Sequence, residues 1–397
     1  MSRVNFPIEG ENTITNLIDN TSDIFSNKSK SHLLYTIISI IVIFSMLILF
    51  FTWMTNTIGL KNSNCKKYKK NYMFSKDNIN QKSLTESNID HGSSKGILRN
   101  YYIKTAFNCC NAGETYKNNW VSECALIYAI KMGARCLDFE IYSIDDIPCV
   151  ASSTQNDFTV KETFNSITLE NILKTIENPN TNDYNYAGRT GEIRDDPLLL
   201  HFRIKSENTK MFNKMATIIR ERIGHILIPG QLANTITLDS LKGKIIIMVQ
   251  HPRFTRISDF NFNGDSRDND QLSDYINFFN NSSNLSESQQ RGQYKFIKYS
   301  QVESEDNQIL KNSSQVDITF VAPDFNSSIY NYNYTKPLAN GCQLIAMKFQ
   351  QLDGNLNSYL KEFSEKNNGV SFWLKPAALR TEIVTDTINV NDDGIST

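Results

Sequence analysis

The sequence lacks an excess of charge of either sign. Its 397 residues include 41 Lys and Arg against 42 Asp and Glu, which gives a formal net charge of −1. Proteins that bind nucleic acid commonly carry a strongly basic surface, because that surface must neutralise phosphates. The composition therefore gives no global electrostatic reason to expect a nucleic-acid partner.

The cysteines lack the paired spacing that marks a zinc site. There are seven of them, an odd number, in a chain too long to need a disulfide framework. We therefore expect reduced and mostly buried thiols at Cys65, Cys109, Cys110, Cys124, Cys136, Cys149 and Cys342.

Residues 33–54 lack any charged side chain and read LLYTIISIIVIFSMLILFFTWM. A helix of these 22 residues spans about 33 Å, which is enough to cross the hydrocarbon core of a bilayer. The run is longer than the apolar part of a signal peptide, and a polar segment precedes it. Tyr35 and Trp53 lie near its ends, where amphipathic aromatic side chains favour the membrane interface. The sequence therefore predicts one transmembrane helix.

Lysine is more frequent after this segment than before it. Two lysines precede it, Lys28 and Lys30, and five follow closely, at Lys61, Lys66, Lys67, Lys69 and Lys70. The flank richer in Lys and Arg is usually cytosolic, and unpaired cysteines agree with that side. The sequence predicts a single-pass membrane protein with a cytosolic C-terminal part. Organelle and virion membranes are both candidates.

Outside this apolar segment, the chain divides into polar stretches and a globular part. Residues 1–32 are polar and expected to be mobile, and residues 55–94, rich in Asn, Ser and Lys, are expected to form a flexible stalk. A globular pattern begins near residue 95. Strands are predicted at 101–107, 134–142, 197–204, 244–250, 341–349 and 370–376, and helices at 120–132, 161–177 and 207–227.

Apolar strands that alternate with helices indicate parallel strands covered on both faces, in an open α/β sheet or a (β/α)₈ barrel. Inside one of the strands, Asp138 and Glu140 stand two residues apart, so both side chains point to the same face. Buried paired acids are costly and usually have a functional or structural reason.

Several stretches resemble the catalytic domain of eukaryotic-type phosphoinositide-specific phospholipase C. VSECALIYAIKMGARCLDFEI (121–141) is similar to the X box, and the likeness continues through 195–228 and 241–249. NGCQLIAMKFQ (340–350) and GVSFWLKPAALR (369–380) resemble the Y box. The resemblance implies a TIM-type (β/α)₈ barrel with its site at the carboxyl ends of the strands. Its parts are an X-box half at 95–251, a linker at 252–270, a Y-box half at 271–383 and a tail at 384–397.

The family resemblance also implies a chemistry. In that family, calcium and two histidines cleave the phosphodiester of a phosphoinositide. The 2-hydroxyl of inositol attacks the phosphate, one histidine acts as the base, and calcium and the other histidine stabilise the phosphoryl charge.

The positions that the resemblance assigns to this site are mostly changed. The two histidines fall at Phe107 and Ser152, and a third carboxylate falls at Arg203. Asn108, Asp138 and Glu140 retain the calcium-ligand positions, with Glu and Asp exchanged. The phosphate-binding lysines fall at about Met248 and Gln250, an arginine of the Y box falls near Asp324, and the substrate tyrosine is retained as Tyr330.

Arg203 places a permanent cation beside two carboxylates. We expect its guanidinium to replace the charge of the metal in a salt bridge with Asp138 and Glu140. In the alternative, Arg203 points elsewhere and the acids bind water or a weaker cation. His201, two residues earlier on the same strand, is expected to be a hydrogen-bonded core histidine.

Two classes of function remain. The first is a membrane-anchored pseudoenzyme without a cofactor, a binding or structural module for the bilayer, phosphoinositide headgroups or a protein partner. The second is an active phosphoric diester hydrolase with Ca²⁺ and a rearranged site of Asp138, Glu140 and His251. Loss of one acid–base group typically costs about 10²–10⁴ in rate, and both are absent here. This favours the pseudoenzyme.

Overall fold

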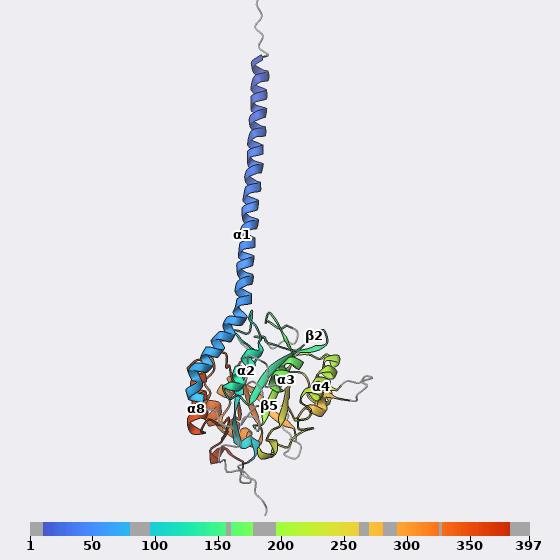
Figure 1. Cartoon of the computed structure of the whole chain (residues 1–397), viewed down its shortest axis with the longest axis vertical. Coiled ribbons are helices and arrows are strands. Elements are labelled where there is room, and N and C mark those ends of the chain that lie inside the picture. Colours follow the sequence, from blue (N-terminus) through green and yellow to red (C-terminus); the bar gives the residue numbers. More distant parts are fainter. Residues whose placement is uncertain are drawn as a thin grey trace, which may run out of the picture. The chain divides into compact units, whose positions relative to one another are not determined.

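The computed structural model describes residues 11–79, 96–155, 160–177, 196–261, 270–280, 292–324 and 328–381, and within the first range the side chains of 30–75 (Figure 1). It divides the chain into two compact units, Met1–Gly59 and Leu60–Thr397. The predicted tail at 384–397 and residues 80–94 of the predicted stalk lie outside the described residues.

Eight parallel strands of the second unit close into a barrel. Their order around the barrel is β1-β2-β5-β6-β7-β8-β9-β10, and β10 pairs again with β1, with Ile103 opposite Leu344. The (β/α)₈ barrel predicted from the sequence is confirmed. The strands are β1 (Tyr101–Ala106), β2 (Cys136–Ile144), β5 (Leu198–Ile204), β6 (Ile245–Gln250), β7 (Phe278–Asn280), β8 (Gln293–Lys298), β9 (Thr319–Ala322) and β10 (Leu344–Met347).

Helices connect the strands of the barrel. Polar side chains cap several of them: Ser122 accepts a hydrogen bond from the backbone of Cys124, and Asn208 from that of Lys210. The helices are α2 (Glu123–Lys131), α3 (Leu169–Glu177), α4 (Thr209–Ile223), α5 (Tyr299–Ser304), α6 (Asn307–Val316), α7 (Thr335–Ala339) and α8 (Gly354–Lys366). Short 3₁₀ turns are η2 (Leu98–Asn100), η4 (Asp239–Leu241), η5 (Ile257–Phe260), η6 (Leu272–Tyr275) and η8 (Ala377–Leu379).

Three antiparallel strands lie outside the barrel. β3 (Ile147–Ala151) and β4 (Ile167–Thr168) extend the sheet from β2, and β11 (Phe372–Leu374) pairs with the first half of β1. The helix predicted at 161–177 therefore begins only at Leu169. Upstream of it, the side chain of Thr163 bonds to the carbonyl of Asn165, a local bond that competes with helix formation.

Helix α1 (Glu11–Ile79) contains the predicted apolar segment but extends beyond it on both sides. The flexible coil predicted at 55–79 is wrong, because these residues continue the helix; residues 11–32 are helical as well. Once a helix is nucleated, each further residue adds a hydrogen bond at little cost, so polar flanks continue it. Within the described residues, α1 is the one helix long and apolar enough to cross a membrane.

The part of α1 that belongs to the second unit packs against the barrel domain. Cys65, Tyr68 and Tyr72 recur at helical spacing on one face. Tyr68 is 1% exposed, and the rings of Tyr68 and Tyr72 lie 6.0 Å and 5.7 Å from that of Tyr128 on α2. The aromatic side chains stand among many Asn, Ser and Lys residues, so the composition of the segment as a whole suggested a stalk.

A disulfide joins Cys65 of α1 to Cys124 of α2, and their Cα atoms are 6.1 Å apart. The prediction of reduced thiols is wrong for this pair, because the fold brings together two cysteines 59 residues apart. The other five cysteines are free and buried, as predicted. Disulfides are typical of oxidising compartments, so the cysteines no longer support a cytosolic location.

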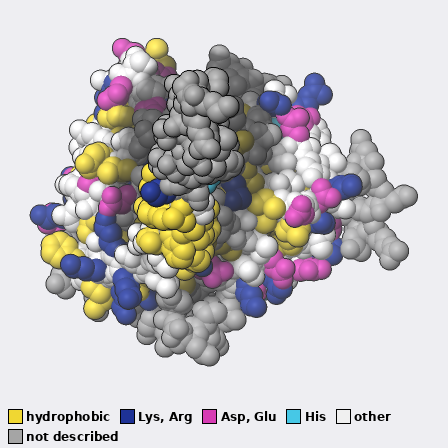
Figure 2. Space-filling view, turned by 90° about the horizontal axis from the view of Figure 1, so that it is seen from above, with side chains coloured by type: hydrophobic (Ala, Val, Ile, Leu, Met, Phe, Trp, Pro, Cys, Tyr) yellow, Lys and Arg dark blue, Asp and Glu magenta, His cyan; other side chains and the backbone are white. Residues whose placement is uncertain are grey.

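Charged side chains of both signs are interspersed on the face shown in Figure 2, and the described residues visible there form no broad patch of one sign. This agrees with the balanced composition of the chain.

We expect the Cys65→Ser/Cys124→Ser double variant to loosen the C-terminal part of α1. The disulfide closes a loop of 59 residues, and the chain-entropy relation gives about 4 kcal/mol of stabilisation for it. Thermal melting of the full chain and trypsin cleavage at Lys66–Lys70 measure the effect. Reducing agent should reproduce it in the wild type and leave the double variant unchanged; equal melting of both proteins without reductant would contradict the prediction.

Candidate functional site

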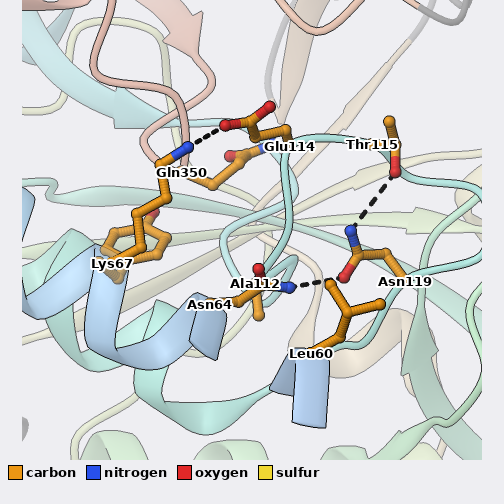
Figure 3. A pocket seen from close by; sticks show the side chains of 9 residues that line it. Leu60, Asn64, Lys67, Ala112, Glu114, Thr115, Asn119 and Gln350 are labelled. Atoms are coloured by element: carbon orange, nitrogen blue, oxygen red, sulfur yellow. Dashed lines mark hydrogen bonds and ion pairs between the residues drawn. The ribbon is translucent and has the colours of Figure 1, made fainter. Parts of the chain in front are cut away.

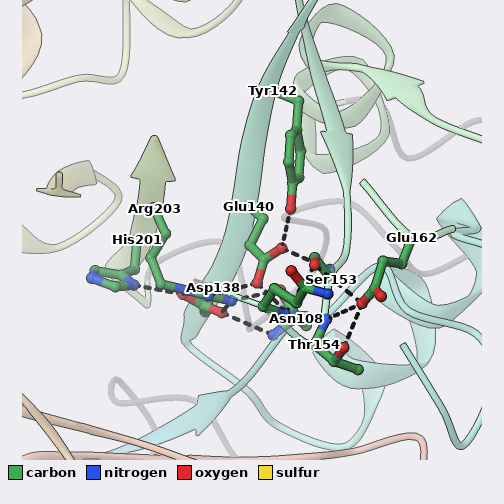
Figure 4. A network of polar contacts seen from close by, with 10 residues as sticks. Asn108, Asp138, Glu140, Tyr142, Ser153, Thr154, Glu162, His201 and Arg203 are labelled. Atoms are coloured by element: carbon green, nitrogen blue, oxygen red, sulfur yellow. Dashed lines mark hydrogen bonds and ion pairs between the residues drawn. The ribbon is translucent and has the colours of Figure 1, made fainter. Parts of the chain in front are cut away.

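The two acids singled out by the sequence lie inside the barrel on β2 (Figure 4). On the neighbouring strand β5, His201 is opposite Asp138 and Arg203 is opposite Glu140. Because side chains alternate along a strand, all four point to the same face. Each of the four is 0% exposed.

Arg203 binds both carboxylates. Its Nε and Nη2 donate to Asp138 Oδ1 and Oδ2 at 2.9 Å and 2.8 Å, and its Nη1 donates to Glu140 Oε1 at 2.7 Å (Figure 4). Nη2 also donates to Asn108 Oδ1 at 2.7 Å. The predicted salt bridge is confirmed, and the alternative in which Arg203 points elsewhere is wrong.

Further donors complete the coordination of the two acids. The backbone N–H of Asn108 donates to Asp138 Oδ2 at 2.9 Å. The hydroxyl of Tyr142 and the backbone N–H of Ser153 donate to Glu140 Oε2 at 2.8 Å and 2.9 Å. Every oxygen of both carboxylates therefore has at least one hydrogen-bond donor.

Attraction between the opposite charges of the cluster offsets the free-energy cost of burying them. Burial by itself raises the pKa of Asp138, but the charge of Arg203 and hydrogen bonds from His201 and Arg203 outweigh it and hold the pKa below its usual value. Burial lowers the pKa of Arg203, yet the charges of Asp138 and Glu140 raise it above its usual value. The lowered pKa of Asp138 and the raised pKa of Arg203 keep this pair charged at neutral pH.

Phe107 and Ser152, at the two positions of the family histidines, are packing residues. The ring centroid of Phe107 lies 4.4 Å from Arg203 Cζ, a cation–π contact, and Tyr116 meets Phe107 edge to face. Ser152 is 1% exposed, and its carbonyl accepts the backbone N–H of Glu162 at 3.0 Å. Neither side chain can exchange a proton at neutral pH.

His251, the candidate for a rearranged site, is held in a turn. Its Nδ1 accepts the backbone N–H groups of Arg253 and Phe254 at 3.2 Å and 3.0 Å, so Nε2 carries the proton and donates to Ser206 O at 3.3 Å. Its ring stacks on Phe254 at 3.8 Å. Burial lowers the pKa of His251 to about 4. These contacts occupy both nitrogens and give His251 a structural role.

His201 is a core histidine, as predicted. Its Nδ1 lies 2.6 Å from Asp138 Oδ1 and its Nε2 lies 2.6 Å from Tyr294 Oη. Burial lowers its pKa, so the neutral ring donates to Asp138 and accepts from Tyr294. The ring also stacks on Phe320 at 4.0 Å.

The other positions that the resemblance assigns to the site take no part in the ion pairs of Arg203. Met248 is fully buried on β6, and Gln250 ends that strand opposite Arg203. Asp324 binds the backbone and hydroxyl of Ser300. Tyr330 is 64% exposed.

The sequence reasoning missed two buried cations that follow the carboxyl ends of barrel strands. Lys205 follows β5 and is 2% exposed; Lys348 follows β10 and is 1% exposed. Lys348 Nζ donates to Ser328 O and lies 5.5 Å from the ring centroid of Tyr116. Burial lowers the pKa of both lysines, that of Lys348 to about 8. A lysine directly after an apolar strand, as in FRIK and AMKF, was the available signal, because such residues gather at the carboxyl edge of a barrel.

A cavity of about 220 Å³ lies between α1 and the loop that follows β1 (Figure 3). Lys67 and Asn64 of α1 bond to Glu114 and Asn119 of that loop beside it. The lining is Leu60, Asn64, Lys67, Tyr68, Ala112, Glu114, Thr115, Asn119 and Gln350. Lys67 and Glu114 neutralise each other, so the cavity offers mainly amide and hydroxyl groups.

The cluster does not fit calcium. Calcium takes six to eight oxygen ligands, several of them carboxylates. Here the guanidinium of Arg203 stands between the acids and bonds to both of them. Among the described residues, no group of three or more His, Cys, Asp and Glu side chains could hold a metal ion.

The family of the barrel follows from a family model. Residues 95–251 match the model of the phosphatidylinositol-specific phospholipase C X domain. The chain therefore contains an X domain of this family, and its closed barrel is of the phospholipase C catalytic type. The match ends at residue 251, so the Y-box half stays a prediction.

Two solved structures support the fold. Those of PLC21 from S. officinalis and from L. pealei each share 16% sequence identity with this chain, with a TM-score of 0.55. Each match covers 72% of this chain but only 38% of the solved chain. A calcium-dependent phosphoinositol-specific phospholipase C from Pseudomonas sp. shares 12% identity, with a TM-score of 0.42 and coverage of 69% and 98%. No curated protein matches the sequence.

We expect Arg203→Met to destabilise the barrel by about 3–5 kcal/mol at pH 7, because it leaves two buried carboxylates without their cation. The pKa of Asp138 is lowered in the folded wild type, so its pairing stabilises that protein above the usual aspartate pKa of about 3.9. The difference between the proteins should therefore shrink as the pH falls below about 4.

Denaturant unfolding from pH 3 to pH 8 measures this difference. Lys210→Met, at a side chain that is 71% exposed, is the matched control and should change stability little at any pH. A loss for Arg203→Met that stays constant across the pH range would exclude the charge explanation.

Proposed function

We propose that this protein is a membrane-anchored phospholipase C-like barrel that has lost catalysis and serves as a binding or structural module. One observation carries the proposal: the guanidinium of Arg203 occupies the space between Asp138 and Glu140 and binds both. Four hydrogen bonds from this guanidinium already go to Asp138, Glu140 and Asn108, so it supplies charge but not the exchangeable ligand position that a metal ion offers to a substrate phosphate.

The acid–base groups support the same conclusion. Phe107 packs on Arg203, Ser152 is buried in the turn after β3, and both nitrogens of His251 are bonded to the backbone. A general acid or base must reach the reacting group with a proton that it can exchange. We therefore infer that the site does not cleave phosphodiesters.

The proposed ligand class is the phosphoinositide headgroup, or a protein that presents similar anionic groups. The family that the X domain belongs to is named for phosphatidylinositol. Lys205 and Lys348 place two cations at the carboxyl ends of β5 and β10, the edge at which barrels of this type bind ligands. Binding there needs no proton transfer, so it survives the loss of catalysis.

The proposed membrane anchor is the apolar segment 33–54 of α1. The large apolar side chains from Leu33 to Trp53 are 44–69% exposed. Burying one such side chain away from water stabilises it by about 1.5–3 kcal/mol, so the segment as a whole strongly favours a bilayer. By the charge rule the lysines that follow it favour the cytosolic side for the barrel, whereas the Cys65–Cys124 disulfide is typical of an oxidising compartment.

We expect Arg203→Glu to create a calcium site that the wild type lacks. The change restores a third carboxylate beside Asp138 and Glu140, with Asn108 as a further oxygen ligand. Calorimetry should detect binding, with a dissociation constant on the order of 10⁻⁴–10⁻³ M, and melting temperature should rise with Ca²⁺. Arg203→Gln is the matched control and should show neither effect.

The wild type tests the loss of catalysis directly. With Ca²⁺ and phosphatidylinositol bisphosphate in mixed micelles, it should release no inositol phosphate above background. Calcium-dependent hydrolysis by the wild type would instead establish the enzyme.

We expect Ile43→Lys/Leu47→Lys to abolish stable membrane attachment. Each lysine at the centre of a transmembrane helix costs about 2.5–3.5 kcal/mol of insertion free energy. The full chain should then move from the pellet to the supernatant in alkaline carbonate extraction, while the control Ile43→Leu/Leu47→Ile stays in the pellet. A wild type that carbonate extracts would contradict the anchor.

A further inference from the structure

The C-terminal part of α1 has an outward face that the packing against the barrel leaves uncovered. Lys66, Lys70, Met73 and Phe74 lie at intervals of four, three and one residues, so they form one stripe of the helix. At 3.6 residues per turn, this stripe is opposite the buried Tyr68. Met73 is 59% exposed and Phe74 is 75% exposed.

The charge around this face has one sign. Residues 55–76 contain six lysines and no Asp or Glu. Lys67 is paired with Glu114, whereas Lys66, Lys69 and Lys70 are exposed and adjacent along the helix.

Large apolar side chains and lysines on one exposed helix face have a characteristic partner. Apolar groups gain free energy by leaving water, and lysines by approaching negative charge. A helix that lies in the surface of an anionic bilayer satisfies both, because its apolar side chains enter the acyl boundary and its lysines meet the headgroups. A face that contacts only water gains no free energy from the exposed side chains of Met73 and Phe74 beside the lysines.

The fold holds this face in place before it meets a partner. The disulfide from Cys65, the buried Tyr68 and the contact of Tyr72 with Tyr128 fix the segment to the barrel domain. A face that is ordered beforehand loses less entropy on binding.

We propose that Lys66, Lys70, Met73 and Phe74 form a docking face for anionic phospholipid, on which the barrel domain rests against the membrane. The inference deepens the proposed function and rests in part on the anchor. It assigns recognition of negatively charged lipid to α1, apart from the cluster that Arg203 closes. The ligand is the negative bilayer surface, and its phosphate and carboxylate groups are the chemistry recognised.

A fluorescent reporter at Met73→Cys tests the proposal in the full chain. The five free cysteines are buried and the other two form the disulfide, so the new thiol is the accessible one for labelling. The labelled chain is reconstituted in nanodiscs of phosphatidylcholine alone or with 30% phosphatidylserine, and spin-labelled lipid is the quencher. We expect quenching with phosphatidylserine, weakening as salt rises, and little without it.

Matched variants separate this face from charge in general. Lys66→Gln/Lys70→Gln should lower the binding constant for the phosphatidylserine surface, as measured by quenching, about 30-fold. Each lysine contributes about a fivefold factor to that constant at an anionic surface. Lys210→Gln/Lys361→Gln removes two exposed lysines on α4 and α8 and should leave it unchanged. An intact disulfide on a non-reducing gel shows that a variant is folded.

The outcomes distinguish the face from the anchor. Co-elution of the chain with nanodiscs reports the anchor alone. Phosphatidylserine-dependent quenching supports the docking face whether or not the chain co-elutes with neutral nanodiscs. A reporter that stays in water with both lipids, or is quenched equally by both, overturns the proposal; the first result would assign the face to a protein partner.

Discussion

The ion pair of Arg203 with Asp138 and Glu140 is the interaction on which the interior of this barrel depends. Two carboxylates that are fully buried would each cost several kcal/mol without a partner. One planar guanidinium supplies donors to both of them and to Asn108 in the turn after β1. The arginine thereby connects β1, β2 and β5, and Phe107 packs on it.

An arginine and a metal ion differ in what they allow a pair of buried acids to do. A metal ion can exchange ligands, so it can accept a substrate oxygen and release a product. A guanidinium is permanently protonated and directional, so its bonds to Asp138 and Glu140 stabilise the fold. The barrel keeps the architecture of a phospholipase C, while its acids serve the structure.

With the interior closed, the features that can meet partners lie at the edge of the barrel and on α1. Lys205 and Lys348 lie at the carboxyl ends of their strands, and the cavity beside Lys67 is built from α1 and the loop after β1. Helix α1 contributes an apolar stretch, a face packed on Tyr128 and a face of lysines and apolar side chains. A single helix thus links the predicted anchor to the domain that it carries.

The sequence by itself predicted parallel strands covered by helices, in an open sheet or a barrel, and the motifs that resemble the phospholipase C family selected the barrel and the ion pair of Arg203. Apolar strands alternating with helices are a local pattern, and the two-residue spacing of Asp138 and Glu140 fixes their common face because side chains alternate along a strand. Only the tertiary structure decided the disulfide between Cys65 and Cys124, the docking of α1 and the backbone bonds that occupy His251. Each of these depends on which distant segments meet, or on how a turn closes, and neither periodicity nor composition carries that information.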